Sequence, residues 1–198
     1  MTIEEAKQEY ISVFKKNIKR EGSAELLEWL KKSDFFVAPA STRFHSNFEG
    51  GLCQHSLNVY NRFKMLLEQE FGNDRKKVIN DESIAVIALL HDVCKVYNYK
   101  TEMRNVKVDG EWVQKPFYVV EDKLPFGHGE KSVYMISGFM KLSREEAMAI
   151  NWHMGGFDAR VVGGASWVMS AAFYEHPIAT LFHMADFMAT YLDEKPVE

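Results

Sequence analysis

Apolar residues recur every three or four positions along most of the chain, which is the period of an amphipathic α-helix. Two such stripes lie within residues 1–32, and we interpret this segment as helical packing at the edge of the core. The later stripes predict a helix from about Cys53 to Phe71 and an apolar helix over residues 81–95. They also predict a helix that begins at His128, one from Arg144 to about His153, and one that begins at Pro177. The pattern is therefore typical of a mainly α-helical protein.

One region breaks the helical period. Between about residues 104 and 120, the strings VKV and EWV alternate in polarity on either side of Asp109-Gly110. An Asp-Gly pair suits the type I′ turn that joins two antiparallel strands. We therefore predict a small β-hairpin inserted in the helical protein, as a candidate flap beside a functional site.

Two further stretches are predicted to be loops. Residues 33–52, SDFFVAPASTRFHSNFEGGL, place Arg43 and His45 between aromatic residues. Composition alone favours a surface loop there over contact with a substrate. Residues 154–166 carry four glycines and are also predicted to form a surface loop.

Length and composition limit the class of protein. The 198 residues suffice for one domain with a substantial core, in which 1–32 would be a packing segment and 33–193 the core. A net charge of −4 without a long basic block argues against a broad face for duplex nucleic acid. The two cysteines, Cys53 and Cys94, form no CxxC pair, which excludes a zinc ribbon and fits a reducing cytoplasm. With no signal-peptide core and no run long enough to span a membrane, we expect a cytoplasmic protein.

The stretch richest in chemistry is IAVIALLHDVCK, where seven apolar residues precede His91 and Asp92. A helix this apolar is packed on most sides, so the polar pair at its end must face a cleft, since a buried charge without a partner is costly. A divalent cation is the natural partner for an imidazole beside a carboxylate. On a helix, Lys95 would lean toward the same side as Asp92. An isolated His-Asp pair would more often be a simple helix end, but other segments supply matching ligands.

The matching ligands lie at or near the ends of other predicted helices: His55, His128, His153 and Asp186. His55 follows the Gly50-Gly51 bend, and such a bend lets backbone or a ligand approach closely. The ordered series of a histidine, a histidine–aspartate pair, two further histidines and a late aspartate resembles the HD-domain metal-dependent phosphohydrolase superfamily. The strings that carry the resemblance are PASTRFHSNFEGGLCQHSLNV, IALLHDVCK, FGHGEKS, AINWHMGG and HMADFMATYL, spread over residues 35–191.

Within the superfamily, the first string looks most similar to the HD domain of bacterial 3′→5′ exoribonucleases. Those enzymes also carry an N-terminal nucleic-acid-binding module, for which this chain leaves no room. This difference from the exoribonucleases argues against processive degradation of RNA.

The resemblance implies an all-α HD fold with the hairpin as an insertion, and it implies roles for the candidate residues. One divalent metal would be bound by His55, His91, Asp92 and Asp186. A second metal, where present, would use His128 and His153, with the Asp92 carboxylate as the bridge. Asp92 and Lys95 would be the catalytic residues, and Lys95 would also neutralise charge on the substrate phosphate. The resemblance also makes substrate contact the favoured interpretation for Arg43 and His45.

We therefore expect a metal-dependent phosphohydrolase of the phosphodiesterase, nuclease or nucleotidase type, acting on a nucleotide or short oligonucleotide. One or two divalent ions would be bound, and the ligands do not distinguish manganese, iron, nickel, cobalt, zinc and magnesium. Two alternatives stay open: a non-catalytic module that binds a nucleotide or metal, and a di-iron oxygenase, since a few HD-fold proteins use an iron pair. Neither duplex nucleic acid nor a membrane is an expected partner, and the sequence leaves the oligomeric state open.

Overall fold

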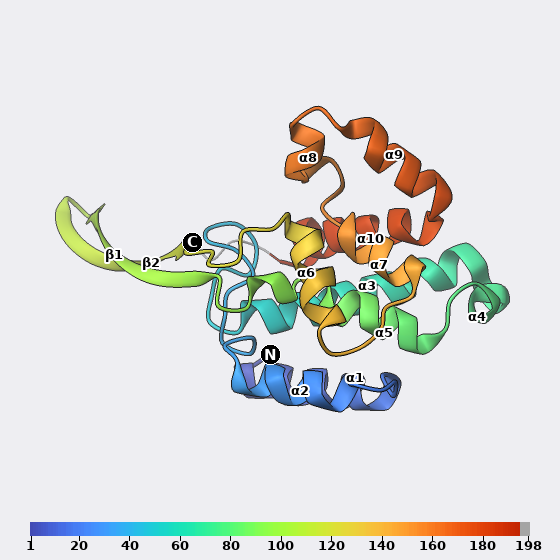
Figure 1. Cartoon of the computed structure of the whole chain (residues 1–198). Helices are drawn as coiled ribbons and strands as arrows, with labels where there is room; N and C mark the ends of the chain where they lie inside the picture. Colours follow the sequence, from blue (N-terminus) through green and yellow to red (C-terminus); the bar gives the residue numbers. More distant parts are fainter. Residues whose placement is uncertain (195–198) are drawn as a thin grey trace.

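The computed structural model describes residues 1–194, which form α-helices and a two-stranded antiparallel sheet (Figure 1). The α-helices are α1 (Ile3–Asn17), α2 (Ser23–Lys32), α3 (Gly51–Phe71), α4 (Arg75–Val78), α5 (Asp81–Leu90), α6 (His128–Ser137), α7 (Arg144–Asn151), α8 (Ala159–Val162), α9 (Ser166–Glu175) and α10 (Pro177–Met188). Three 3₁₀ turns, η1 (Gly72–Asp74), η2 (Val93–Lys95) and η3 (Gly155–Phe157), and one π turn, η4 (Ala189–Asp193), complete the helical structure. The predicted helical fold with a small hairpin is confirmed.

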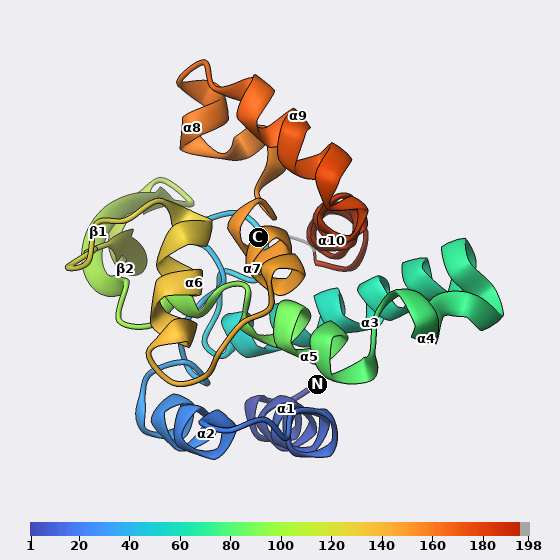
Figure 2. The same cartoon turned by 45° about the vertical axis from the view of Figure 1, so that its right-hand side comes forward.

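Helix α5 lies at the centre of the core. Every residue from Ile84 to Leu90 is at most 1% exposed, because α1, α3 and α7 all pack against this helix. Figures 1 and 2 place α1 and α2 on one side of α3 and α5, with α8 and α9 on the opposite side. The Tyr10 hydroxyl of α1 donates a hydrogen bond of 2.8 Å to the Leu89 carbonyl, which ties the N-terminal helices to the end of α5. Helix α10 packs on both α3 and α7.

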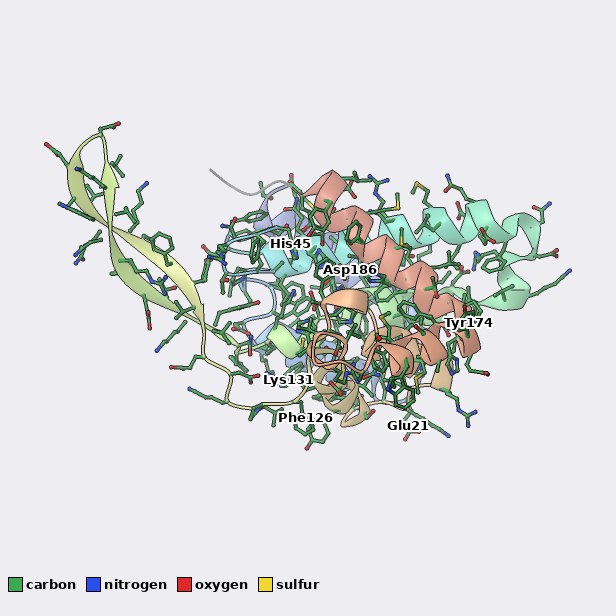
Figure 3. The ribbon with its side chains drawn as sticks, turned by 90° about the horizontal axis from the view of Figure 1, so that it is seen from above. Glu21, His45, Phe126, Lys131, Tyr174 and Asp186 are labelled. Atoms are coloured by element: carbon green, nitrogen blue, oxygen red, sulfur yellow. The ribbon has the colours of Figure 1, made fainter. Side chains whose placement is uncertain are left out.

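The hairpin is longer than predicted. Strands β1 (Tyr99–Val108) and β2 (Glu111–Val120) pair in register from Tyr99 opposite Val120 to Val108 opposite Glu111. The predicted start near residue 104 was wrong because the first residues of β1 are mostly polar and lack an alternating pattern. The turn itself is as predicted, since Asp109 and Gly110 have φ values of 51° and 93°, as a type I′ turn requires. The paired strands project away from the helices (Figures 1 and 3).

The structure differs from the predicted local structure in three other places. The stretch 154–166 is not a simple loop, because it contains η3 and α8 and leads directly into α9. Helix α9 was not predicted, since its sequence SWVMSAAFYE has apolar residues all round and no amphipathic stripe. The helix expected from Arg144 to about His153 ends at Asn151. Within residues 1–194, no helix combines the length and the apolar character needed to cross a bilayer.

Candidate metal centre

The Asp92 carboxylate lies at the centre of a buried cluster of imidazoles. Its Oδ1 atom is 2.8 Å from His128 Nε2 and 3.6 Å from His153 Nε2. Its Oδ2 atom is 3.4 Å from His91 Nε2 and 3.5 Å from His55 Nε2. Four histidines from four different segments therefore approach one carboxylate.

The sixth predicted ligand residue joins the cluster from α10. Asp186 Oδ1 lies 3.2 Å from His55 Nε2. These side chains form three groups, and within each group the ligand atoms all lie within 4.8 Å of one another. The groups are His55, His91 and Asp92; His91, His153 and Asp186; and Asp92, Cys94 and His128. The structure thus brings together all six residues that the sequence singled out. Asp186 and the loop residue His45 line one cavity, and Figure 3 marks both.

The glycine pair before His55 is required by the packing of the preceding loop. Gly50 has a φ of +83°, in the left-handed region. A Cβ on Gly51 would lie 2.0 Å from the Ser46 carbonyl oxygen, so only glycine permits this approach. The contact holds the loop against the start of α3, where the rings of His45 and His55 are 4.8 Å apart.

Hydrogen bonds to carbonyls orient two of the imidazoles. The Nδ1–H of His91 donates to the Ala88 carbonyl at 2.9 Å, and that of His153 donates to the Ile150 carbonyl at 2.6 Å. Each bond holds the proton on Nδ1, so the Nε2 lone pair points toward the cluster. His153 Nε2 is buried and has no hydrogen-bond partner within residues 1–194. A buried nitrogen of this kind is costly unless a further group binds it.

Glu194 completes the surroundings of His55, and sequence reasoning missed it. Its carboxylate accepts hydrogen bonds from His55 Nδ1 at 2.9 Å, Ser46 Oγ at 2.7 Å and Asn58 Nδ2 at 3.0 Å. Burial opposes the charged forms of both groups, but their attraction outweighs it, raising the pKa of His55 to about 10 and lowering that of Glu194 to about 2. No local pattern marks Glu194, which lies one residue beyond the predicted core.

Lys95 reaches the cluster from a 3₁₀ turn and not from a helix. The prediction of one continuous helix through Lys95 was wrong, because α5 ends at Leu90 and η2 follows. Residues three apart are eclipsed in a 3₁₀ turn, so Lys95 Nζ still lies 2.6 Å from Asp92 Oδ2. Burial opposes ionisation of Asp92, but the Lys95 ammonium and the nearby imidazoles outweigh it and hold the pKa of this carboxyl well below its usual value.

Burial and neighbouring charges also shift the pKa values of other groups in the cluster. Burial opposes ionisation of Asp186, but His55 outweighs it and lowers the pKa of this carboxyl. Burial lowers the pKa of His91 and His128, which favours neutral imidazoles. Burial also raises the pKa of Cys94 to about 12, and its sulfur lies 3.5 Å from His128 Nε2. Sequence reasoning did not include Cys94, although it follows Asp92 by two positions.

A cavity of about 670 Å³ opens over the cluster. Lys95 and five of the six candidate ligands, all except His91, line this cavity. Its apolar lining residues are mostly aromatic or aliphatic: Phe44, Tyr99, Val120, Phe157, Phe187 and Tyr191. The base of the hairpin therefore lines the cavity through Tyr99 and Val120, whereas the rest of the hairpin projects away.

The structure separates the two predicted substrate-binding residues of the loop. His45 lines the cavity, and burial together with the charge of His55 lowers its pKa to about 4. Arg43 is exposed, stacks over Phe44 with its guanidinium carbon 5.0 Å from the ring centroid, and is not among the lining residues. His183, which was not among the residues predicted from the sequence, also lines the cavity, and its Nδ1–H donates to the His153 carbonyl at 2.7 Å.

Comparison with known proteins identifies the family of the chain. A family model described as HD domain matches residues 52–181, which is more than half of the chain. A curated protein of Methanocaldococcus jannaschii, "Dihydroneopterin 2′,3′-cyclic phosphate phosphodiesterase", is 42% identical over 65 residues, covering 31% of this chain and 24% of that protein. No solved structure matches the chain. These matches do not single out the bacterial 3′→5′ exoribonucleases. The closer resemblance to their HD domain therefore stays a prediction. The chain belongs to the HD domain family.

Proposed function

We propose that this protein is a metal-dependent phosphohydrolase that cleaves a phosphodiester in a nucleotide-derived compound. The observation that carries the proposal is the Asp92 carboxylate, which is shared by two groups of ligand atoms and also contacts Lys95. The name of the M. jannaschii relative supports a cyclic phosphodiester as substrate, although the chain spans only 24% of that protein.

The residues present fit divalent cations. His55 Nε2 and His91 Nε2 lie 3.3 Å apart, and the Nδ1 atom of each is already engaged. At this distance a proton or a cation lies between the two nitrogens, and His153 Nε2 has no hydrogen-bond partner within residues 1–194. Imidazole and carboxylate ligands suit manganese, iron, cobalt, nickel or zinc. One ion would be held by His55, His91, Asp92 and Asp186, and a second by Asp92, His128 and His153.

When bound, such ions polarise a phosphoryl oxygen and lower the pKa of the attacking water. The chain's own contribution begins with Lys95, whose ammonium lines the cavity beside Asp92 and would neutralise charge that develops on the phosphate oxygens. The water oxygen forms the new bond to phosphorus, the ester P–O bond breaks, and the alcohol leaves with a proton. Ala88, Ile150 and Glu194 hold three imidazoles in orientation during this step.

The test is hydrolysis of adenosine 2′,3′-cyclic phosphate by the Mn²⁺-loaded protein, followed by chromatography of the adenosine monophosphate product. We expect Asp92→Asn and Asp186→Asn each to lower kcat at least about a hundredfold, since each removes a charge that the reaction uses. Asp74→Asn is the matched control, because Asp74 is a surface carboxylate with a side chain 68% exposed. Thermal unfolding of each variant shows whether the fold is retained.

Activity that is equal in wild type and Asp92→Asn would contradict the proposal. Tight binding of the nucleotide without product, under several divalent metals, would instead favour a non-catalytic module. Turnover that requires both iron and oxygen would favour the oxygenase alternative.

A further inference from the structure

One wall of the cavity is formed by three aromatic side chains whose rings are left partly in solvent. Phe157 of η3, Phe187 of α10 and Tyr191 of η4 line the cavity, and they are 58%, 39% and 63% exposed. Aromatic rings carry a large apolar surface, and burying it is favourable. These three rings are therefore positioned to gain free energy from an apolar partner in the cavity.

The three rings form one continuous surface. The planes of Phe157 and Phe187 are 20° from parallel, with centroids 6.2 Å apart. Phe187 and Tyr191, one helical turn apart, have centroids 4.6 Å apart. We call Phe157, Phe187 and Tyr191 the aromatic wall. The ring of Tyr191 is tilted by 37° from that of Phe187. Three neighbouring ring surfaces of this kind suit a flat partner better than a branched aliphatic one.

The aromatic wall starts directly beside the candidate metal centre. Phe187 follows Asp186 in α10, and Asp186 contacts His55 at 3.2 Å. Tyr191 lies four residues beyond Phe187, which corresponds to a rise of about 6 Å along a helix. A substrate whose phosphate lies at the metal centre would therefore extend its remaining part along the wall.

The charges of the cavity favour a neutral group at the wall. Lys95 is the only lysine or arginine among those lining residues that the structure describes, and it lies at the Asp92 end. The wall itself adds a phenol and two phenyl rings and no cation. A second phosphate along the wall would have no charged partner among Phe157, Phe187 and Tyr191 themselves.

Resting on the proposed function, we propose that the aromatic wall is a stacking site for a neutral, planar heteroaromatic group joined to the phosphate that is cleaved. The substrate class is thus a phosphate ester of a nucleobase-like or pteridine-like compound. Phe187 is the central specificity residue, since it contacts both other rings and adjoins Asp186.

The first experiment measures binding without any phosphate. Neopterin is titrated by its own fluorescence, adenosine by calorimetry, and ribose serves as the non-aromatic probe. We expect both aromatic compounds to bind and ribose not to bind. Phe187→Leu, which keeps an apolar side chain but removes the ring, should weaken binding about tenfold, as loss of stacking on one aromatic ring does. Met184→Ala is the matched control, because Met184 lies on the same helix, is 44% exposed and does not line the cavity. Equal binding by wild type and Phe187→Leu would overturn the inference.

The second experiment separates this inference from the proposed function. Adenosine 2′,3′-cyclic phosphate and ethylene phosphate share a five-membered cyclic diester, and only the first carries a base. We expect wild type to prefer the adenosine compound in kcat/KM, and Phe187→Leu to reduce that preference about tenfold. If both compounds are hydrolysed and the preference is the same in wild type and Phe187→Leu, the stacking site is refuted and the hydrolase is supported. Adenosine binding that depends on Phe187, with neither compound cleaved, would support the stacking site and refute the hydrolase.

Discussion

The two ends of α5 each hold a buried cluster of charged side chains, and the clusters differ in how completely their polar atoms are paired. At the N-terminal end, the Glu146 carboxylate accepts hydrogen bonds from two nitrogens of Arg20 at 2.7 Å each. It also accepts from Ser83 Oγ at 2.7 Å and from the Ser143 amide at 2.8 Å. Protein groups alone therefore satisfy this carboxylate, and the cluster ties α5 and α7 to the turn after α1.

At the C-terminal end of α5 the pairing is incomplete. His153 Nε2 has no hydrogen-bond partner in the described part of the chain, and its contact with Asp92 Oδ1 is 3.6 Å long. Buried charge alone therefore does not identify a binding site. A structural cluster closes on itself, whereas a site for a cation leaves lone pairs directed at one region.

The largest expected effect comes from breaking the complete cluster. Arg20→Met leaves the Glu146 carboxylate, which is 1% exposed, without its cation, and should lower the free energy of unfolding by about 3 kcal/mol. Arg104→Met on the hairpin removes an exposed ion pair and should change the free energy of unfolding by less than about 0.5 kcal/mol. Urea unfolding of both variants makes the comparison, and metal content should be unchanged in each. Equal stability of the two variants would contradict the structural role of this cluster.

A smaller effect is expected from weakening the hydrogen bond between Glu194 and His55 at the candidate metal centre. Glu194→Gln removes the charge that holds His55, and should weaken metal affinity about tenfold with little change in stability. Competition with a chelator measures the affinity. Asp193→Asn is the matched control, because Asp193 pairs with Arg62 and does not line the cavity. If both variants bind metal as wild type does, Glu194 has no part in positioning His55.

The smallest effect concerns pH and the complete cluster. Burial opposes ionisation of Glu146, but Arg20 and the hydrogen bonds outweigh it and lower its pKa below the ordinary value of 4.5. Ionised Glu146 therefore stabilises the fold above about pH 4.5, and this contribution is lost as the pH falls through the folded-state pKa. Glu146→Gln should lower the free energy of unfolding by about 1 kcal/mol at pH 7. The difference in this free energy between the variant and wild type, measured by urea unfolding, should shrink as the pH falls below 4.5. A difference that stays constant from pH 7 to pH 3 would exclude the charge as its cause.

The residues of the candidate centre were readable from the sequence because ligands have few chemical types. Histidine and aspartate at the ends of apolar helices stand out against their neighbours, as His91 and Asp92 do after α5. The Asp109-Gly110 turn was readable for a similar reason, since few residues tolerate a positive φ at both positions.

The surroundings of the centre could not be read in the same way. Glu194 is an ordinary acidic residue whose role depends on contacts with residues more than a hundred positions away. Arg43 and His45 share one loop, yet in the folded chain only His45 lines the cavity. The aromatic wall combines residue 157 with residues of α10 and η4, so it exists only in the folded chain.

The most direct test of the central claim is the metal content of the purified protein after reconstitution, measured by mass spectrometry for wild type, His91→Ala and His176→Ala. His176 pairs with Glu145 away from the cavity and serves as the control. We predict at least one equivalent of divalent metal in wild type and in His176→Ala, and a large loss in His91→Ala. Equal metal in all three proteins, or none in wild type, would contradict the assignment of the metal centre.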